Sequence, residues 1–392
     1  MTPTSPTKKV LVTGGTGVVG TTLVRQLLKK GYYVRVLSRN GFSEHSNLAV
    51  EQHNALCRAE VVLGGITDPQ ALECALDGVE IVFHLAAMLG SHPLELTHRA
   101  KGRALSDQYR QVNVEGTKRL VEAAGRIGVA RIVFFSSISV YGSGKKRAFV
   151  ADESCSPAPD SLYAASKLEA ERCVLAARNR KNEFMGVVLR VASVYGPKEK
   201  KNYALLIKMA RYGFFITIGK GNARRTLIHD HDLARAAILA AEHPKAKGNI
   251  YNVTDGKVHS FNDIRKAIAL CFGKQQINIR LPERLVYSLL PMLEKFPKAH
   301  FFASGLKNLV EDTAVSGDKI QRDLGFSPRV DLKNGWKNAT DRVFQGQGFG
   351  RSAVLEGSDV HEQPGKQGEG GNKGDEHGKP GEESEQYRWD EV

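Results

Sequence analysis

The chain has 392 residues, of which 41% are hydrophobic and 25% charged, and it carries a formal net charge of +14. This composition is typical of a globular protein with room for two lobes. No stretch is apolar enough to span a membrane, and the polar residues Met1–Lys9 hold no hydrophobic signal region, so we expect a cytoplasmic protein. Five scattered cysteines without a Cys-x-x-Cys pair argue against a disulfide framework or a metal site, and basic residues without a nucleic-acid module favour anionic small molecules over nucleic acid.

Short apolar runs alternate with helical patterns through the first half of the chain. The expected strands are Lys9–Thr13, Tyr33–Ser38, Glu60–Leu63, Ile81–His84, Arg131–Ser136 and Gly186–Arg190. Two of the helical patterns between them cover Val114–Arg126 and Tyr163–Asn179. Alternation of this kind predicts an α/β fold with a doubly wound parallel sheet and helices on both of its faces.

The first expected strand ends in a glycine-rich turn. Thr13–Gly20 reads T-G-G-T-G-V-V-G and leads into the amphipathic run Thr21–Leu28. Between a strand and a helix, such glycines allow a tight turn and a close approach of the backbone to a pyrophosphate, which the helix N-terminus attracts. The motif predicts a Rossmann-type dinucleotide site whose phosphate contacts are Gly14, Thr16, Gly17, Val18, Val19 and Gly20.

Hydroxyl groups and a Tyr–Lys pair follow later in the chain. Phe135–Gly142 reads F-S-S-I-S-V-Y-G at the end of the fifth strand, and Y-A-A-S-K opens a helix at Tyr163. The spacing of four places Tyr163 and Lys167 on the same face of that helix. A nearby cation lowers the pKa of a phenol, so Tyr163 becomes a usable general acid or base, and Ser137 can hold the substrate oxygen beside it.

With these motifs the chain resembles the extended short-chain dehydrogenases/reductases, the NAD-dependent epimerase/dehydratase type. The resemblance runs from about Val10 to about Val343 and is closest to bacterial nucleotide-sugar 4-epimerases and 4-keto reductases. It also includes H-L-A-A at His84, L-R-V-A-S-V-Y-G-P at Leu189 and R-T-L-I-H-D-H-D at Arg225.

The resemblance implies roles for residues in each motif. The catalytic triad would be Ser137, Tyr163 and Lys167. Further cofactor contacts would come from Asp68, Leu85, Ala86, Ala87, Asn113, Tyr163, Lys167 and Val191, although Asn113 can equally serve packing. Substrate contacts would come from Ser137, Asn202 and Arg225, the last of which matches an arginine that binds the diphosphate of nucleotide sugars. Helices Val114–Arg126 and Tyr163–Asn179 would pair into the four-helix bundle of a homodimer.

The end of the second strand bears on the choice of cofactor. An acidic residue about 20 positions after the glycine motif accepts the ribose hydroxyls of NAD, whereas an arginine there accommodates the phosphate of NADP. Arg39 occupies this place, in V-L-S-R-N, without an acidic neighbour. Its planar fork of donors suits a phosphate, so we favour NADP over NAD, with a plain surface arginine as the alternative.

These features predict an NAD(P)-dependent oxidoreductase that acts on a keto or hydroxyl carbon, in the first place of a nucleotide-linked deoxysugar. Three alternatives stay open: a nucleotide-sugar 4-epimerase that retains NAD, a steroid- or flavonoid-type ketone reductase, and a dinucleotide-binding protein without catalysis. Residues 1–186 would form the NAD(P)-binding domain, completed by about residues 225–245, and residues 187–344 would form mainly a smaller substrate lobe. Residues 345–392 would be a disordered polar tail, because Gly357–Gln386 has almost no aliphatic side chains to bury.

Overall fold

The computed structural model describes residues 8–41, 57–89, 99–142, 150–197, 203–273, 275–286, 288 and 312–345. All of them belong to one compact unit, residues 1–349. Asn202 and residues 346–392 of the predicted tail lie outside these ranges.

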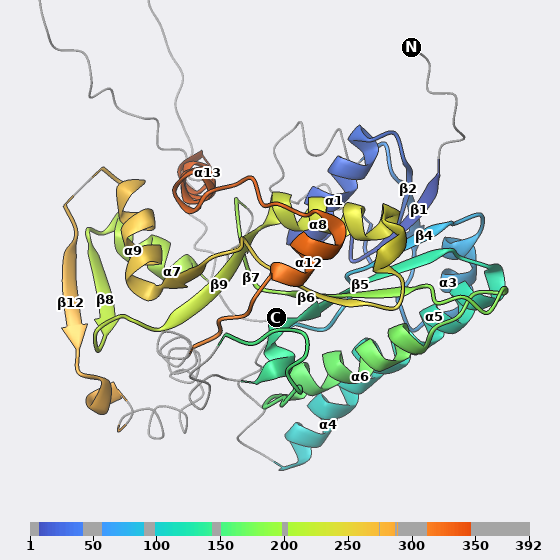
Figure 1. Ribbon diagram of the computed structural model, residues 1–392, viewed down its shortest axis with the longest axis horizontal. Coiled ribbons are helices and arrows are strands. Elements are labelled where there is room, and N and C mark those ends of the chain that lie inside the picture. Colours follow the sequence, from blue (N-terminus) through green and yellow to red (C-terminus); the bar gives the residue numbers. More distant parts are fainter. Residues whose placement is uncertain are drawn as a thin grey trace, which may run out of the picture. The chain divides into compact units, whose positions relative to one another are not determined.

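Seven parallel strands form the main sheet, in the order β10-β6-β5-β4-β1-β2-β3 (Figure 1). They are β1 (Lys9–Thr13), β2 (Tyr33–Ser38), β3 (Glu60–Leu63), β4 (Ile81–His84), β5 (Arg131–Ser137), β6 (Gly186–Val191) and β10 (Ile250–Val253). The chain builds outward from β1 to β3 on one side and from β4 to β10 on the other, so the winding changes direction between β1 and β4. The predicted doubly wound parallel sheet is confirmed, and it continues past residue 186 through β6 and β10. Ligands of such sheets bind beyond the carboxyl ends of the strands at the switch point.

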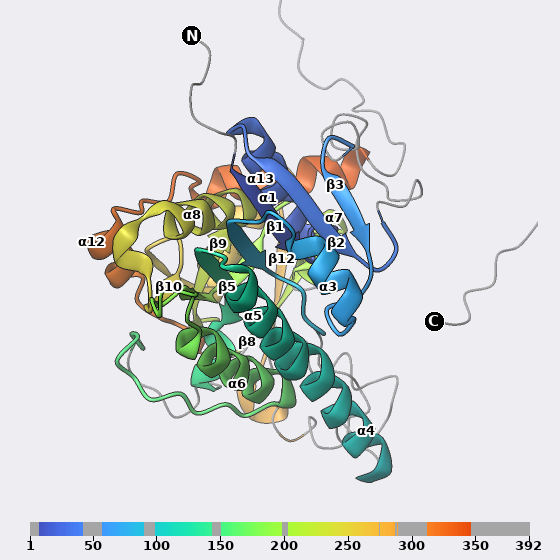
Figure 2. The ribbon, with the colours of Figure 1, turned by 90° about the vertical axis from the view of Figure 1, so that its right-hand side faces the viewer.

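Helices cover both faces of this sheet (Figure 2). One face carries α1 (Val18–Lys29) and α8 (Asp230–Glu242), and the other carries α3 (Pro69–Leu76), α5 (Gly116–Ile127) and α6 (Leu162–Ala176). Within β1, Val10 and Val12 belong to the core on the α1 side, whereas Leu11 belongs to the core on the α5 side. Successive strand side chains point to opposite faces, so an apolar run such as Val10–Val12 fits a strand that is buried on both.

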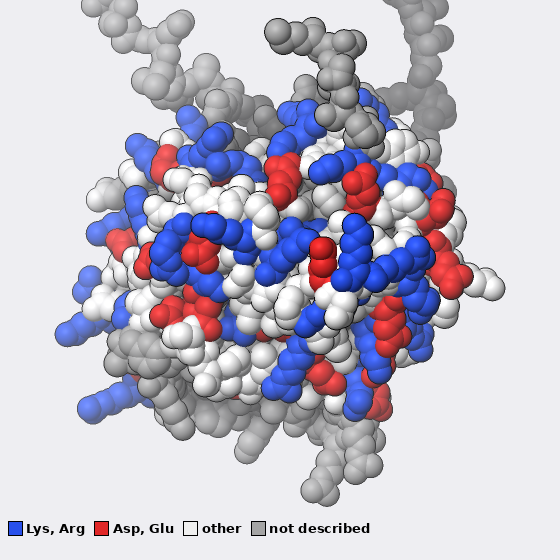
Figure 3. All heavy atoms as spheres, turned by 45° about the vertical axis from the view of Figure 1, so that its right-hand side comes forward, with Lys and Arg blue, Asp and Glu red and all other residues white. Residues whose placement is uncertain are grey.

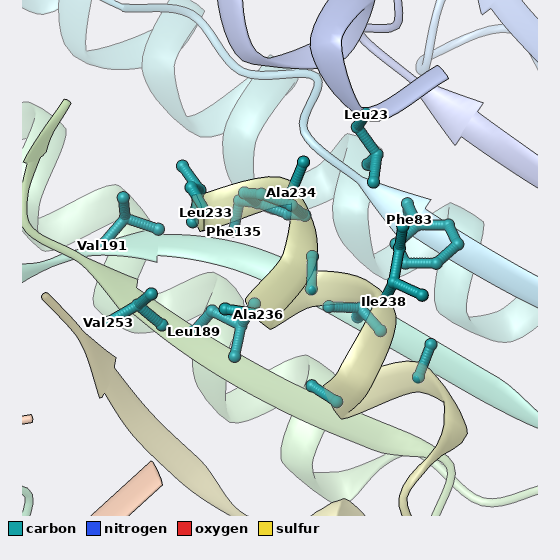
Figure 4. Packing of buried hydrophobic residues seen from close by; sticks show 14 of the residues in the cluster. Leu23, Phe83, Phe135, Leu189, Val191, Leu233, Ala234, Ala236, Ile238 and Val253 are labelled. Atoms are coloured by element: carbon teal, nitrogen blue, oxygen red, sulfur yellow. The ribbon is translucent and has the colours of Figure 1, made fainter. Parts of the chain in front are cut away.

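The packing of α8 shows how closely a helix approaches the sheet (Figure 4). Its inner face presents Leu233, Ala234, Ala236 and Ile238 to the apolar strand residues Phe135, Leu189, Val191 and Val253. Alanine favours the helix and leaves little side chain between helix and strand. The alanine-rich sequence of α8 thus explains both why the helix forms and why it packs closely on β5 and β6.

A second set of elements follows the main sheet. One small sheet has the order β11-β9-β7 and another pairs β12 with β8. Their strands are β7 (Ser193–Tyr195), β8 (Phe214–Ile218), β9 (Arg224–His229), β11 (Val258–Ser260) and β12 (Ile277–Leu281). The helices of this region are α7 (Ala204–Arg211), α9 (Phe261–Leu270), α12 (Asp318–Leu324) and α13 (Leu332–Gln345). A separate apolar cluster that includes Tyr195, Phe215 and Trp336 joins several of them.

The remaining elements are short or precede α5. They are α4 (Arg99–Tyr109), the π-helix η2 (Arg110–Glu115), and the 3₁₀-helices η3 (Ile138–Tyr141) and η5 (Pro244–Ala246). No helix within the ranges given above is long and apolar enough to cross a membrane. On the face shown in Figure 3, Asp and Glu side chains lie between the Lys and Arg side chains, so positive charge is dispersed there.

Candidate active site

The turn between β1 and α1 packs directly against the loop that follows β4. Gly14 has a φ of +70°, and a Cβ atom on it would lie 2.8 Å from the backbone nitrogen of Ala86. A Cβ atom on Gly20 would lie 2.1 Å from the carbonyl oxygen of Gly14. Both positions therefore need glycine. The turn and the loop Leu85–Ala87 together form one surface at the switch point of the sheet.

The N-terminus of α1 offers this surface a place for an anion. Gly17 is the N-cap residue and provides no side-chain cap, and the first turn of the helix holds no acidic residue. The first N–H groups of a helix have no partner within it, and the helix dipole makes them attractive to phosphate. The residues Thr16–Val19 thus fit the pyrophosphate of a dinucleotide, and the glycines leave room for it.

A chain of buried hydrogen bonds crosses the sheet next to this turn. The Ala86 N–H donates to Thr13 Oγ1 (3.2 Å), which lies 2.7 Å from His84 Nδ1. On the other side of the ring, His84 Nε2 lies 2.9 Å from Thr117 Oγ1, which donates its proton to the Asn113 carbonyl (2.6 Å). Thr117 has one proton to give, so it accepts from His84 Nε2–H, and Thr13 donates to Nδ1. His84 thereby links the glycine turn to the helix that carries Asn113.

Asn113 ties three segments together. It lies in the π-helix η2, a form that often marks functional positions. Its Oδ1 accepts from the Met88 N–H (2.7 Å), and its Nδ2 donates to the Met88 carbonyl (3.2 Å) and to Ser166 Oγ (3.0 Å). Ser166 in turn donates to the Tyr163 carbonyl (2.8 Å). Asn113 therefore fixes the loop after β4 relative to the first turn of α6.

Ser137 and Tyr163 meet at the carboxyl edge of β5. The helix α6 starts here because Ser161 caps it, with Ser161 Oγ accepting from the Ala164 N–H (3.2 Å). Ser137 Oγ accepts from both the N–H (3.1 Å) and the hydroxyl (2.9 Å) of Ser139, which leaves its own proton for Tyr163. Burial raises the pKa of Tyr163 to about 12, although the hydrogen bond with Ser137 lowers it. Tyr163 is therefore protonated at neutral pH and able to give a proton.

Lys167 lies one turn further along α6 and points onto the sheet. Its side chain is 2% exposed, and Nζ lies 4.1 Å from the centre of the Phe134 ring. Burial lowers the pKa of Lys167 to about 7, while the charge of Glu171 raises it. Burial and the charge of Lys167 lower the pKa of His84 to about 3, so the imidazole is neutral. Burial is thus the largest influence on the Tyr163 phenol, and the hydrogen bond with Ser137 is the influence that lowers its pKa.

The residues predicted for the adenosine end of the site are more exposed. Arg39 follows β2 directly and is exposed, and its Cγ lies 4.0 Å from where a Cβ on Gly65 would be. Asp68 caps α3, since its Oδ1 accepts from the N–H groups of Gln70 (3.0 Å) and Ala71 (3.2 Å). The pair Asp68-Pro69 is a helix-start signal that explains this structural role from sequence.

The remaining predicted site residues lie in different settings. Val191, predicted as a cofactor contact, ends β6 and pairs in register with Ser137 of β5. Arg225 is buried in β9 and pairs in register with His259 of β11, whose Nε2 lies 2.6 Å from Asp255 Oδ2. Asn202 lies outside the described residues. In the part of the chain that the structure covers, no group of His, Cys, Asp or Glu is arranged to hold a metal ion.

Comparison with known proteins identifies the family. A model of the NAD-dependent epimerase/dehydratase family matches residues 10–254, which cover most of the main sheet and the whole Ser–Tyr–Lys set. The chain belongs to this family. The predicted enzyme class, an NAD(P)-dependent dehydrogenase/reductase or epimerase, is thereby confirmed.

Relatives with different substrates are similar to the chain. A 3β-hydroxysteroid dehydrogenase/Δ5→4-isomerase of Mycobacterium tuberculosis is 31% identical over 339 residues, which span 82% of this chain and 86% of that protein. The crystal structure of a UDP-glucose 4-epimerase from Thermotoga maritima with UDP-glucose is 25% identical, covers 86% of this chain and 99% of its own, and superposes with a TM-score of 0.66. The structure of MoeE5 in complex with UDP-glucose and NAD is 26% identical over the same shares, with a TM-score of 0.65.

Sequence reasoning missed several polar residues that surround the predicted set Ser137, Tyr163 and Lys167. Ser139 orients Ser137, and the hydroxyl spacing in S-S-I-S was a signal for it. Ser136, Glu171 and Arg190 form a buried cluster next to Lys167. An arginine inside the apolar strand G-V-V-L-R-V needs a buried hydrogen-bonding partner, but the sequence does not say which one.

Proposed function

We propose that this protein transfers hydride between a nicotinamide dinucleotide and a keto or hydroxyl carbon, with Tyr163 as the general acid/base. The observation that carries the proposal is the arrangement at the switch point. The glycine turn and the uncapped N-terminus of α1 follow the carboxyl end of β1, and Ser137 lies with Tyr163 at the carboxyl end of β5, on the other side of β4. A dinucleotide laid along this edge would have its phosphates at α1 and its nicotinamide near Tyr163.

Each side chain then has a chemical task. The bound dinucleotide supplies or accepts the hydride. Tyr163 gives the proton to the carbonyl oxygen during reduction and takes it back during oxidation. Ser137, oriented by Ser139, holds that oxygen beside the phenol. Lys167 lies one turn from Tyr163, where its positive charge favours the phenolate that forms when the proton leaves.

For the substrate, we propose a nucleotide-linked sugar, reduced at a keto carbon. Two solved relatives that span nearly their whole length on this chain hold UDP-glucose. Arg225 stands in the R-T-L-I-H-D-H-D segment, whose arginine matches the one that binds the diphosphate in nucleotide-sugar enzymes of the family. A guanidinium is well suited to a diphosphate because it presents several donors in one plane.

A sterol is the second candidate, and the identity to the mycobacterial 3β-hydroxysteroid dehydrogenase favours it. That relative matches this chain at 31%, above the 25% and 26% of the two sugar-nucleotide structures. The hydride and proton steps would be the same on either substrate. The two candidates differ in the group that the small sheets and helices after the main sheet must bind, a nucleotide diphosphate or a sterol ring system.

For the cofactor, we propose NADP, bound through Arg39. The exposed guanidinium directly after β2 supports a contact with the 2′-phosphate, whereas MoeE5 was solved with NAD. A net reductase must exchange its cofactor in each turnover, which distinguishes it from an epimerase that retains NAD.

We also propose a homodimer that forms through α5 and α6. These helices pack side by side on one face of the sheet, and a surface hollow beside them is lined by Val121, Gly125, Arg178 and Met185. Sedimentation of the purified protein at micromolar concentration should give twice the chain mass, and a monomer would contradict the proposal.

A substrate panel tests the proposed function. The protein is incubated with NADPH and UDP-linked 4-keto sugars, and separately with NAD or NADP and a 3β-hydroxysteroid, and products are read by mass spectrometry. Reduction of a nucleotide sugar by wild type but not by Tyr163→Phe is the expected result. If only the steroid is turned over, the substrate is a sterol and not a nucleotide sugar, and the proposed hydride and proton transfers are still supported.

A further inference from the structure

A buried ion pair lies one helical turn beyond Lys167. Glu171 is 1% exposed and Arg190 is 3% exposed. Arg190 Nε lies 3.1 and 3.2 Å from the two carboxylate oxygens of Glu171, and Arg190 Nη2 lies 2.8 Å from Glu171 Oε2. Ser136 Oγ donates a further hydrogen bond of 2.5 Å to Glu171 Oε1. The carboxylate is therefore held from two strands, β5 and β6.

The same carboxylate also faces Lys167. Residues four apart on a helix are neighbours on one face, so Glu171 and Lys167 lie on the side of α6 that packs on the sheet. The other groups against the Lys167 side chain are the Phe134 ring on β5 and the neutral His84 on β4. Among these groups, Glu171 is the one with a negative charge. The Arg190 guanidinium is paired with the carboxylate, and its carbon lies 4.8 Å from the centre of the Tyr141 ring.

Stability alone does not account for this arrangement. Replacing a buried ion pair by apolar residues of similar volume is often neutral or stabilising, so a buried pair is weak support for a fold. Taking both charges out of water also has a desolvation cost. A cost of this kind is consistent with a task in the neighbouring site.

We propose that Glu171 is a positioning residue for the hydride-transfer site, held in place by Arg190 and Ser136 so that its carboxylate favours the charged form of Lys167, one helical turn from Tyr163. The inference rests on the proposed function for its purpose, but the charge of Lys167 can be measured without any substrate. Burial pulls the pKa of Lys167 down to about 7 and Glu171 opposes that pull. Loss of the carboxylate should therefore lower the pKa of Lys167 further and reduce the fraction of Lys167 that carries a charge near neutral pH.

The experiment follows Lys167 directly. Protein labelled with ¹³C at the lysine ε-carbon is titrated by NMR, and the Lys167 signal is assigned from its disappearance in Lys167→Met. The variants are Glu171→Gln, Glu171→Asp and the double variant Glu171→Gln/Arg190→Met. The double variant removes both buried charges, so it separates loss of the carboxylate from the strain of an unpaired Arg190. Glu169→Gln, an exposed carboxylate on the same helix, is the matched control.

The expected result is a titration midpoint of Lys167 that falls by about one pH unit or more in the folded Gln variants, in line with the usual effect of removing an adjacent opposite charge. Glu171→Asp and Glu169→Gln should keep the wild-type midpoint. A midpoint unchanged in a folded Gln variant would overturn the proposal, and so would failure of the double variant to fold, because the pair would then serve the fold. If Lys167 shifts as expected but no substrate is turned over, the proposed function fails and the electrostatic role stands.

Discussion

The two ends of the proposed dinucleotide site are built in different ways. At the catalytic end, formed by Ser137, Tyr163 and Lys167, each group is held by neighbours on other elements, and Lys167 is almost fully buried. At the adenosine end, Arg39 is exposed beside Gly65. Preorganised polar groups stabilise a transition state most strongly where water is excluded. An exposed arginine makes a weaker contact, because water competes for the same partner. The catalytic end should thus govern rate, and the adenosine end should govern cofactor choice.

The largest effect should come from the catalytic end. Tyr163→Phe keeps the ring and its packing but removes the proton donor, so turnover should fall by about 10²–10⁴-fold. The dissociation constant of the cofactor, measured by fluorescence titration, should stay nearly the same. Undiminished turnover in this variant would show that Tyr163 is not the proton donor and would favour a dinucleotide-binding site without catalysis.

A change at the adenosine end should leave turnover intact and alter affinity. Arg39→Asp removes a charge-assisted contact with the 2′-phosphate, which is worth about 1.5–3 kcal/mol, and NADH should then bind more tightly than NADPH. Isothermal titration of both cofactors checks this, with Lys266→Glu, an exposed charge reversal on α9, as the control. Equal binding of both cofactors by the wild type would remove the case for Arg39.

Between the two ends lies the glycine turn, which should tolerate no side chain. Gly14→Ala places a Cβ 2.8 Å from Ala86 N, and overpacking of this kind costs about 1–3 kcal/mol. Gly31→Ala is a matched control, because Gly31 also has a positive φ, of +83°, but nothing lies within 4 Å of its Cβ position. Urea unfolding should show a larger loss of stability for Gly14→Ala, and equal losses would mean that backbone strain alone accounts for both.

The smallest effect concerns pH and the buried charge. The pKa of Lys167 is about 7 in the folded protein, below its ordinary value, so between these values the unfolded chain binds a proton that the folded chain does not. The free energy of unfolding therefore gains a contribution that rises with pH over this window. Lys167→Met lacks this contribution. The free energy of unfolding of the variant minus that of the wild type should therefore fall by about 1–2 kcal/mol from pH 7 to pH 9. A pH-independent difference would show that Lys167 in the folded protein does not lose its proton at a lower pH than an ordinary lysine does.

The contrast between the ends also explains what sequence could foresee. The predicted strands Lys9–Thr13, Tyr33–Ser38, Glu60–Leu63 and Ile81–His84 coincide with β1 to β4, because apolar runs bounded by turns leave few alternatives. The residues of the glycine turn and the Tyr163–Lys167 pair could be predicted because the motifs follow one another in the order that is typical of a dinucleotide-binding enzyme. The helix expected at Val114–Arg126 instead begins as a π-helix and continues as Gly116–Ile127, a local change that periodicity does not show.

Contacts between distant elements lay beyond the sequence. Nothing in the order of residues says that Glu171 meets Arg190, because 19 positions and two elements separate them. Likewise, the chain from Ala86 through His84 to Asn113 depends on how β1, β4 and α5 are stacked. Asp68 differs from these residues, because its role can be read from its neighbours in the sequence. The resemblance to the family implied a cofactor contact, whereas the pair Asp68-Pro69 favours the start of a helix, and Asp68 caps α3 in the structure.

The proposed role of Tyr163 in hydride transfer can be followed with a labelled hydride. Nicotinamide cofactor deuterated at C4 is added to wild type and to Tyr163→Phe, together with the nucleotide-sugar and steroid ketone panels, and products are analysed by mass spectrometry. We expect one deuterium on the reduced carbon with wild type and at least about 100-fold slower labelling with the variant. Label that enters product equally fast in both proteins, or enters none of the panel although the cofactor binds, would contradict this role.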